Sequence, residues 1–149
     1  MNVIEHTRRS AVAVEVDTPI SEVARTMEAA AVGAVAVQDR GELVGIVTDR
    51  DLIRRWLAHR LDPSARVDGV MSSPVVTIPA SADIRDVYPL FASHSIRRVA
   101  IVDESGSFVG MLSIDDVLMN LSADLAAVLR PVAAEVPAIP TDSSAAASL

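Results

Sequence analysis

The sequence contains no cysteine and no lysine, and aromatic side chains make up only 3% of its 149 residues. Without thiolates the chain has no disulfide framework, no cysteine nucleophile and no thiolate metal site. Without lysine it has neither a Schiff-base nucleophile nor the phosphate-binding lysine of a P-loop. Several classes of enzyme are therefore excluded, and the absence of cysteine is compatible with a reducing compartment.

Long apolar runs and clusters of positive charge are also missing. No hydrophobic run approaches the roughly 18 residues that a membrane span needs, and the N-terminus lacks the charged-then-apolar order of a signal peptide. We therefore expect a cytoplasmic protein that does not associate with membranes. The formal net charge is -7, and the arginines gather only in the pairs Arg8-Arg9, Arg54-Arg55 and Arg97-Arg98. Such a charge repels a polyphosphate backbone, so a nucleic acid is not an expected partner.

What the sequence does contain is an internal repeat. Residues 43–52 (LVGIVTDRDL) recur as residues 108–117 (FVGMLSIDDV), 65 positions later, and residues 20–23 match residues 84–87 at an offset of 64. The second copy is therefore one residue longer, in the turn at residues 103–107. Half of all residues are hydrophobic, and a chain of this length buries about 70% of its unfolded surface, enough for an aliphatic core.

The hydrophobic period changes in the same order in both copies: strand, helix, strand, strand, helix. The predicted fold class is α/β (α+β), with two β-α-β-β-α repeats related by pseudo-two-fold symmetry. In the first repeat we expect strands at residues 12–16, 35–37 and 43–48 and helices from Ile20 and Leu52. In the second we expect strands at residues 75–78, 99–102 and 108–113, a helix from Ile84 and a helix running toward Arg130.

These elements set the expected boundaries. Residues 1–60 form the first repeat, residues 61–69 a linker and residues 70–130 the second repeat, followed by a disordered tail of Ala, Pro and Ser at residues 131–149. Pro89 conflicts with this scheme, because a proline inside a helix removes a hydrogen bond and kinks it.

Each repeat places the same polar motif at the end of a buried strand. Glycine is followed after three positions by Thr or Ser and after three more by Asp, as Gly45, Thr48 and Asp51 and as Gly110, Ser113 and Asp116. One interpretation is a capping box that only starts a helix. The other is a nucleoside site, because a helix N-terminus attracts phosphate and a carboxylate accepts hydrogen bonds from a ribose diol. Two copies at matched positions favour the second.

The chain resembles a tandem pair of CBS (cystathionine β-synthase) domains, also called a Bateman module. The resemblance covers about residues 3 to 125. It rests on the paired motifs together with residues 70–78 (VMSSPVVTI), similar to the family's lead-in to its first strand, and residues 96–103 (IRRVAIVD), similar to its second strand and the basic pair before it.

The resemblance implies two clefts that take AMP, ADP, ATP or a related adenosine compound such as S-adenosylmethionine. Asp51 and Asp116 would hold the ribose, with Thr48 and Ser113 near the phosphates. The remaining implied contacts are Ser72 and Pro74 to Val76 for the adenine of the Asp51 site, residues 7–12 for that of the Asp116 site, and Arg97 and Arg98 for the phosphates beside Asp116.

The first repeat departs from the family pattern. Gly33 and Ala34 stand where the second repeat has Arg97 and Arg98, and we expect His6 at the position of Met71. The clefts should therefore be unequal, with the Asp116 site the better phosphate binder. The Asp51 site is then weak, empty or served by Arg50.

No catalytic or metal constellation can be assembled from the remaining residues. The three histidines, at positions 6, 59 and 94, form no i, i+4 pair that could bind a metal ion. Acidic residues in the first turn of a helix normally serve to stabilise the helix dipole. The expected protein is a non-catalytic module that requires no cofactor and signals to an unidentified partner protein. A homodimer is expected through the helix of Leu52, Ile53, Trp56 and Leu57 and that of Val117, Leu118 and Leu121.

Two alternatives stay open. In the first, the chain is a ligand-free homodimeric scaffold and its T/S-x-x-D motifs serve only as caps. In the second, which we rank last, it binds nucleic acid, and this predicts a steep dependence on salt.

Overall fold

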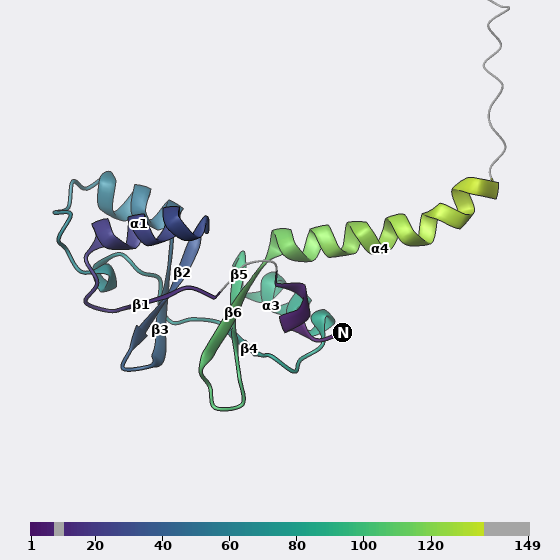
Figure 1. Ribbon diagram of the computed structural model, residues 1–149, viewed down its shortest axis with the longest axis horizontal. Coiled ribbons are helices and arrows are strands. Elements are labelled where there is room, and N and C mark those ends of the chain that lie inside the picture. The colour runs from purple at the N-terminus through teal and green to yellow at the C-terminus, as the bar shows by residue number, and fades with distance from the viewer. Residues whose placement is uncertain (8–10, 136–149) are drawn as a thin grey trace, which may run out of the picture. The chain divides into compact units, whose positions relative to one another are not determined.

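The computed structural model describes residues 1–7 and 11–135. Each repeat forms one three-stranded sheet with its first strand parallel and its third antiparallel to the middle strand (Figure 1). The strands are β1 (Ala13–Glu15), β2 (Ala34–Asp39) and β3 (Glu42–Thr48) in the first sheet, and β4 (Thr77–Pro79), β5 (Arg98–Val102) and β6 (Phe108–Ser113) in the second. The expected fold class and the two repeats are confirmed.

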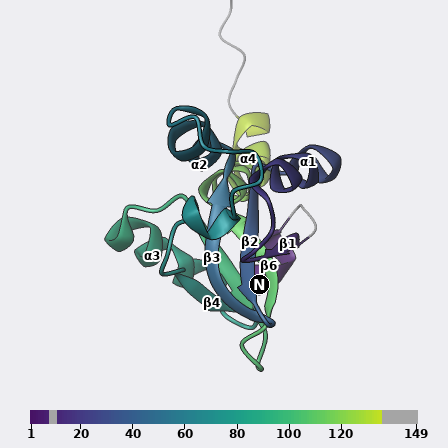
Figure 2. The same cartoon turned by 90° about the vertical axis from the view of Figure 1, so that its left-hand side faces the viewer.

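The helices follow the same order in both halves. The first repeat has α1 (Ile20–Ala30) after its first strand, and α2 (Asp49–Asp51) continuing into the π-helical η2 (Leu52–Leu57) after its third. The second has the 3₁₀ turn η4 (Ile84–Asp86) with α3 (Val87–His94), and then α4 (Ile114–Glu135). Figure 2 shows α1 and α2 from the side of the first repeat. The 3₁₀ turns η1 (Val3–His6) and η3 (Val67–Gly69) precede the two sheets.

Pro89 lies in the first turn of a helix, whereas we expected it in a helix interior. The chain forms a 3₁₀ turn up to Asp86 and α3 starts at Val87, so Pro89 is the third residue of that helix. The first four N–H groups of a helix have no intrahelical acceptor, so a proline at the third position removes no hydrogen bond from the helix.

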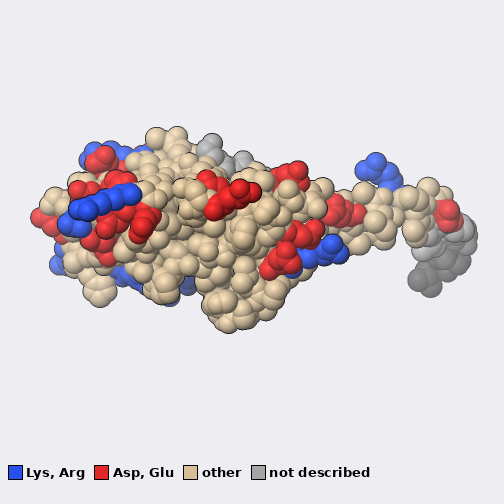
Figure 3. Space-filling view, turned by 90° about the horizontal axis from the view of Figure 1, so that it is seen from below, with Lys and Arg blue, Asp and Glu red and all other residues tan. Residues whose placement is uncertain are grey.

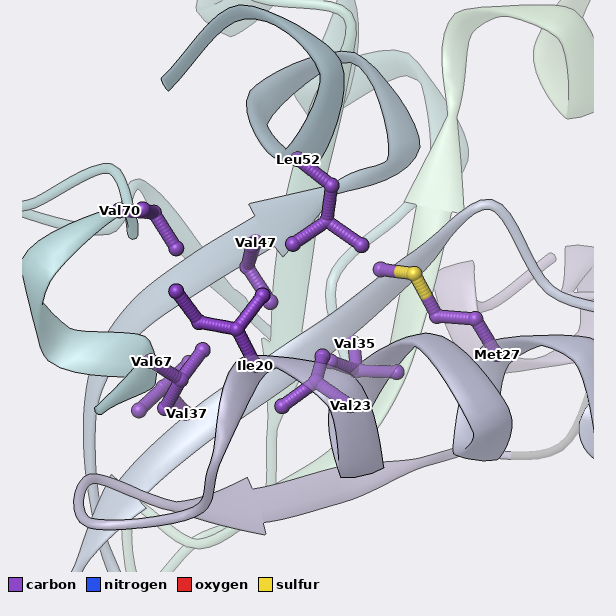
Figure 4. Close-up of a cluster of buried hydrophobic side chains, with 9 residues drawn as sticks. All are labelled: Ile20, Val23, Met27, Val35, Val37, Val47, Leu52, Val67 and Val70. Atoms are coloured by element: carbon purple, nitrogen blue, oxygen red, sulfur yellow. The ribbon is translucent and has the colours of Figure 1, made fainter. Parts of the chain in front are cut away.

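The core of the first repeat is aliphatic, as its composition predicts. Ile20, Val23 and Met27 of α1 pack against Val35, Val37 and Val47 of the sheet. Leu52, Val67 and Val70 complete the cluster (Figure 4). Because Val67 and Val70 lie just before the second repeat in sequence, the first repeat takes part of its core from the segment leading to the second.

The second repeat completes its core with the N-terminus of the chain. Val3 is fully buried among residues of the second repeat, and its N–H donates to the carbonyl of Ala82 at 2.9 Å. In the first repeat the N–H of Val67 donates to the carbonyl of Thr18, also at 2.9 Å. Each 3₁₀ turn therefore packs on the repeat to which it does not lead.

The C-terminal helix differs from the expectation in two respects. It continues through Pro131 to Glu135, so residues 131–135 are helical; residues 136–149 of the expected tail lie outside the described residues. It is also long and apolar enough to cross a membrane by length and composition, with 22 residues and a mean hydropathy of 1.4. The expectation that no hydrophobic stretch approaches the length of a membrane span is wrong by this measure. Residues up to Val117 belong to one compact unit and residues from Leu118 to another.

Candidate functional site

The first T-x-x-D motif closes a reciprocal cap where β3 runs into α2. The N–H of Thr48 donates to Oδ2 of Asp51 at 2.9 Å, and the N–H of Asp51 donates to Oγ1 of Thr48 at 3.1 Å. Both side chains are half-buried. The capping interpretation is therefore correct in geometry, and it holds the Asp51 carboxylate rigidly at the start of a helix.

The second motif repeats this arrangement where β6 runs into α4. The N–H and the Oγ–H of Ser113 donate to Oδ2 of Asp116 at 3.0 and 2.8 Å, and the N–H of Asp116 donates to Oγ of Ser113 at 3.1 Å. The structure thus builds the same carboxylate-bearing helix start twice within one compact unit.

The glycine of the first motif, Gly45, allows the segment that leads to the second repeat to pack closely against β3. Ser72 pairs with Ile46 of β3 through two backbone hydrogen bonds of 2.8 and 3.0 Å. A Cβ on Gly45 would overlap the sulfur of Met71 and would lie 3.2 Å from the carbonyl oxygen of Ser72. The base-lining segment expected for the Asp51 site therefore lies directly on the strand that carries Thr48.

The second motif is approached by the N-terminal segment in the same way. A Cβ on Gly110 would lie 3.3 Å from Ile4 and 3.7 Å from Thr7. Residues 8–10, expected to line the Asp116 site with Thr7, lie outside the described residues. His6 does not take the position of Met71: it is buried together with Val3, at the spacing of Val70 and Val67. The turns thus match at an offset of 64, not 65.

Gly33 and Arg97 occupy matched positions, as expected. The carbonyl of Gly33 accepts from the N–H of Asp49 at 3.0 Å, and that of Arg97 accepts from the N–H of Ile114 at 2.8 Å. The Arg97 guanidinium lies 3.5 Å from the Asp115 carboxylate, and both side chains are largely exposed. Arg97 therefore stays beside the helix start of its own repeat.

Arg98 points toward the other repeat. Its Nη2 lies 3.5 Å from the place of a Cβ on Gly33, and an oxygen of Asp49 lies 3.3 Å from the same place. Arg98 is thus located where the two repeats meet, a position that sequence reasoning missed. The signal in the sequence is the glycine at position 33, which has no side chain to crowd the Arg98 guanidinium or the Asp49 carboxylate.

The other residues expected in the Asp51 site lie at or near the surface. Arg50, Ser72 and Pro74 are exposed and Val76 is half-buried. Pro74 instead lines a cavity of about 920 Å³ with the tips of the hairpins β2–β3 and β5–β6, whose lining residues do not include Thr48 or Asp51. Among residues 1–7 and 11–135, no three His, Asp or Glu side chains are grouped to hold a metal ion.

Comparison with known proteins identifies the architecture. The CBS domain family matches the chain twice, at residues 3–58 and 67–123. The "CBS domain-containing protein YhcV" of Bacillus subtilis is 37% identical over 101 residues, which make up 68% of this chain and 71% of that protein.

Solved structures agree with the sequence relatives. A CBS domain protein from Pyrobaculum aerophilum, complexed with AMP, is 26% identical with a TM-score of 0.71 and covers 83% of this chain and 99% of its own. The cytosolic domain of the Mg²⁺ channel MgtE, in complex with ATP, is 33% identical with a TM-score of 0.62 and covers 74% of this chain and 44% of its own. With both repeats matched by the family and by these structures, the chain belongs to the CBS domain family and forms a CBS pair.

Proposed function

We propose that this CBS pair binds an adenosine-containing ligand, such as AMP, ADP, ATP or S-adenosylmethionine, and reports its presence to a partner protein. The observation that carries the proposal is the duplicated helix start, with one carboxylate fixed beside a lead-in segment in each repeat. A carboxylate accepts both hydroxyls of a ribose, and the helix N-terminus attracts the phosphate next to it.

The geometry at Asp51 leaves a suitable oxygen for this role. The cap uses Oδ2 of Asp51, so Oδ1 is the oxygen that we propose for the ribose hydroxyls. The adenine would lie against the segment from Ser72 to Val76, which the glycine at position 45 brings onto β3. Two relatives of similar fold, solved with AMP and with ATP, support an adenine nucleotide as the ligand class.

The proposed role is regulatory rather than catalytic. The curated relative YhcV is described only as a CBS domain-containing protein, and the chain matches no more than 25% of the magnesium transporter MgtE of Thermus thermophilus. We propose a cytoplasmic homodimer whose conformation or stability changes with ligand. On the face drawn in Figure 3, basic side chains lie among acidic ones, which does not favour nucleic acid as the partner.

We also propose that the two clefts differ in affinity. Arg97 stands at the helix start of Asp116, whereas the matched position in the first repeat is Gly33. The Asp116 cleft should therefore bind phosphate better, and the Asp51 cleft relies on Arg50 or on Arg98 reaching across. Asp116→Ala is expected to weaken nucleotide binding more than Asp51→Ala in a calorimetric titration, and the reverse order would contradict unequal clefts in this sense.

A melting curve of the purified protein with AMP, ADP, ATP, NAD and S-adenosylmethionine in turn tests the ligand itself. A ligand at about 100 times its dissociation constant stabilises the fold by about 2.7 kcal/mol. We expect a shift with one adenosine compound that is reduced in Asp116→Ala. A protein that responds to none of these compounds is not an adenosine sensor.

A ligand-free scaffold is the second candidate, and the capping geometry favours it. Both T/S-x-x-D motifs form reciprocal helix caps, and Ile53 and Leu57 of η2 are 60% and 64% exposed. On this hypothesis the melting temperature does not change with any nucleotide, and a protein partner binds the exposed apolar helices.

A further inference from the structure

Arg55 joins the two parts of the Asp51 site. Its Nη1 donates to the carbonyl of Met71 at 2.9 Å and to the carbonyl of Val70 at 3.1 Å. Its Nε lies 3.9 Å from Oδ1 of Asp51, one helical turn earlier. One guanidinium therefore contacts the carboxylate and the backbone that leads to the second repeat.

These contacts bridge elements that are far apart in sequence. Arg55 belongs to η2, the continuation of the helix that starts at Asp51, and the two carbonyls belong to the chain 15 and 16 residues later. The next residue, Ser72, pairs with β3. The position of the segment expected to line the base is thus tied to the helix that carries the ribose carboxylate.

The contacts of Arg55 indicate a structural brace rather than a surface ion pair, because both hydrogen bonds go to backbone carbonyls. The Arg55 side chain is half exposed, whereas that of Asp51 is 16% exposed, and Val70 is fully buried in the core. Two hydrogen bonds from a charged donor to backbone carbonyls are stronger than a long pair between exposed charges. The position 65 residues after Arg55 is Asn120 in the second repeat, so no guanidinium stands at the matched place.

We infer that Arg55 is a positioning residue of the Asp51 cleft: it fixes the segment at Met71 and Ser72 relative to Asp51, so that base and ribose are held at one fixed separation. The effect on ligand binding rests on the proposed function, whereas the brace itself rests only on the contacts of Arg55. It predicts that loss of Arg55 weakens ligands that need both parts of the site and spares ligands that need only one.

The brace is tested first without ligand, by hydrogen exchange in the intact protein. In Arg55→Met, which keeps an apolar stem but removes the donors, the amide of Ser72 should exchange about tenfold faster, the equivalent of one charged hydrogen bond. The amide of Val16, bonded to the carbonyl of Gln38 at 2.9 Å, reports general loosening of the first repeat and should not change. Arg54→Met, at an exposed neighbouring position, is the matched control.

The functional test compares AMP with ribose 5-phosphate, which lacks the base. Titrations use the full chain carrying Asp116→Ala, so that the Asp51 cleft is the one observed. Adding Arg55→Met should weaken AMP about tenfold and ribose 5-phosphate less than about twofold, and adding Arg54→Met should change neither.

Three results would overturn the inference. Equal weakening of both compounds means that Arg55 acts on the ribose phosphate directly. Unchanged affinity for AMP means that the separation is set elsewhere. An unchanged exchange rate at Ser72 means that there is no brace. If the parent protein binds neither compound, the proposed function fails at this cleft, and the exchange rate alone decides whether Arg55 is a brace.

Discussion

At the scale of single residues, the two motif glycines have a packing role that their place in the motif does not reveal. Gly45 and Gly110 lie in the third strand of their sheets, and each faces a segment from elsewhere in the chain. The approach at Gly45 is the closer one, because both the side chain of Met71 and the backbone of Ser72 lie against it.

Gly45→Ala is therefore expected to destabilise the fold. The new methyl group would lie 3.0 Å from Cγ of Met71 and 3.2 Å from a backbone oxygen of Ser72, a residue held on β3 by two hydrogen bonds. Overpacking of this kind costs about 1–3 kcal/mol, measurable by urea denaturation. Gly69→Ala is the control, since no atom lies within 4 Å of the place that its methyl group would take; an equal loss in both variants would refute the packing argument.

At the scale of elements, the turn between β5 and β6 shows how the extra residue of the second repeat is accommodated. Oδ1 of Asp103 accepts from the hydroxyl of Ser105 at 2.6 Å and from the amides of Ser105 and Ser107 at 2.9 and 3.0 Å. Gly106 takes the left-handed conformation with φ of 82°. The carboxylate thus stabilises the longer turn by accepting three hydrogen bonds from within it.

This turn makes stability depend on pH. The hydroxyl of Ser105 and the amides of Ser107 and Ser105 lower the pKa of Asp103 from its ordinary value of 3.8. A lowered folded-state pKa means that the stabilisation is present above pH 3.8 and is lost as the pH falls through the folded value. Asp103→Asn keeps the acceptor oxygen but does not titrate. Its free energy of unfolding should approach that of the wild type as the pH falls below 3.8; a constant difference at all pH values would contradict this.

The helical segment η2 offers the test of the proposed homodimer. Ile53 and Leu57 lie one turn apart and are mostly exposed, while Leu52 beside them is buried. Ile53→Asp combined with Leu57→Asp should shift the protein from dimer to monomer in light scattering, because buried unpaired carboxylates oppose association. Arg54→Asp is the control for charge alone. A double variant of unchanged mass would exclude this face from the interface.

At the scale of the whole molecule, the exchanged 3₁₀ turns make the two repeats depend on each other. Val3 and Val67 are both fully buried. Val3 precedes the first repeat but belongs to the core of the second, and Val67 precedes the second repeat but belongs to the core of the first. The compact unit therefore includes Met1 to Val117, and a boundary drawn between residues 60 and 70 cuts through contacts that both cores need.

Val3→Ala should loosen the second repeat although it changes the third residue of the chain. We expect a loss of about 1–3 kcal/mol in the free energy of unfolding. Hydrogen exchange should rise at the amide of Ala100 in β5 more than at the matched amide of Ala36 in β2. Val67→Ala should give the opposite order, and Met1→Ala, which alters an exposed side chain, should change neither. The same order of exchange in both core variants would contradict the exchanged packing.

The sequence by itself determined the repeat, the order of elements, the fold class and the position of both motifs. These follow from local spacing: hydrophobic alternation, the offset between the copies and the capping pattern depend on residues within a few positions of one another. The same locality explains the errors, since Pro89 was placed in a helix interior when the helix begins only at Val87.

Only the tertiary structure decided which segments meet. The packing of Val3 on the second repeat, of Met71 on Gly45, of Arg98 beside Gly33 and of Arg55 on the carbonyls of Val70 and Met71 joins residues 15 to more than 60 positions apart. Such contacts depend on the close packing of complementary surfaces, which no periodicity in the sequence encodes. For this reason the motif aspartates and their caps were identified from the sequence, whereas the contacts of Arg55, Met71 and Arg98 near them were not.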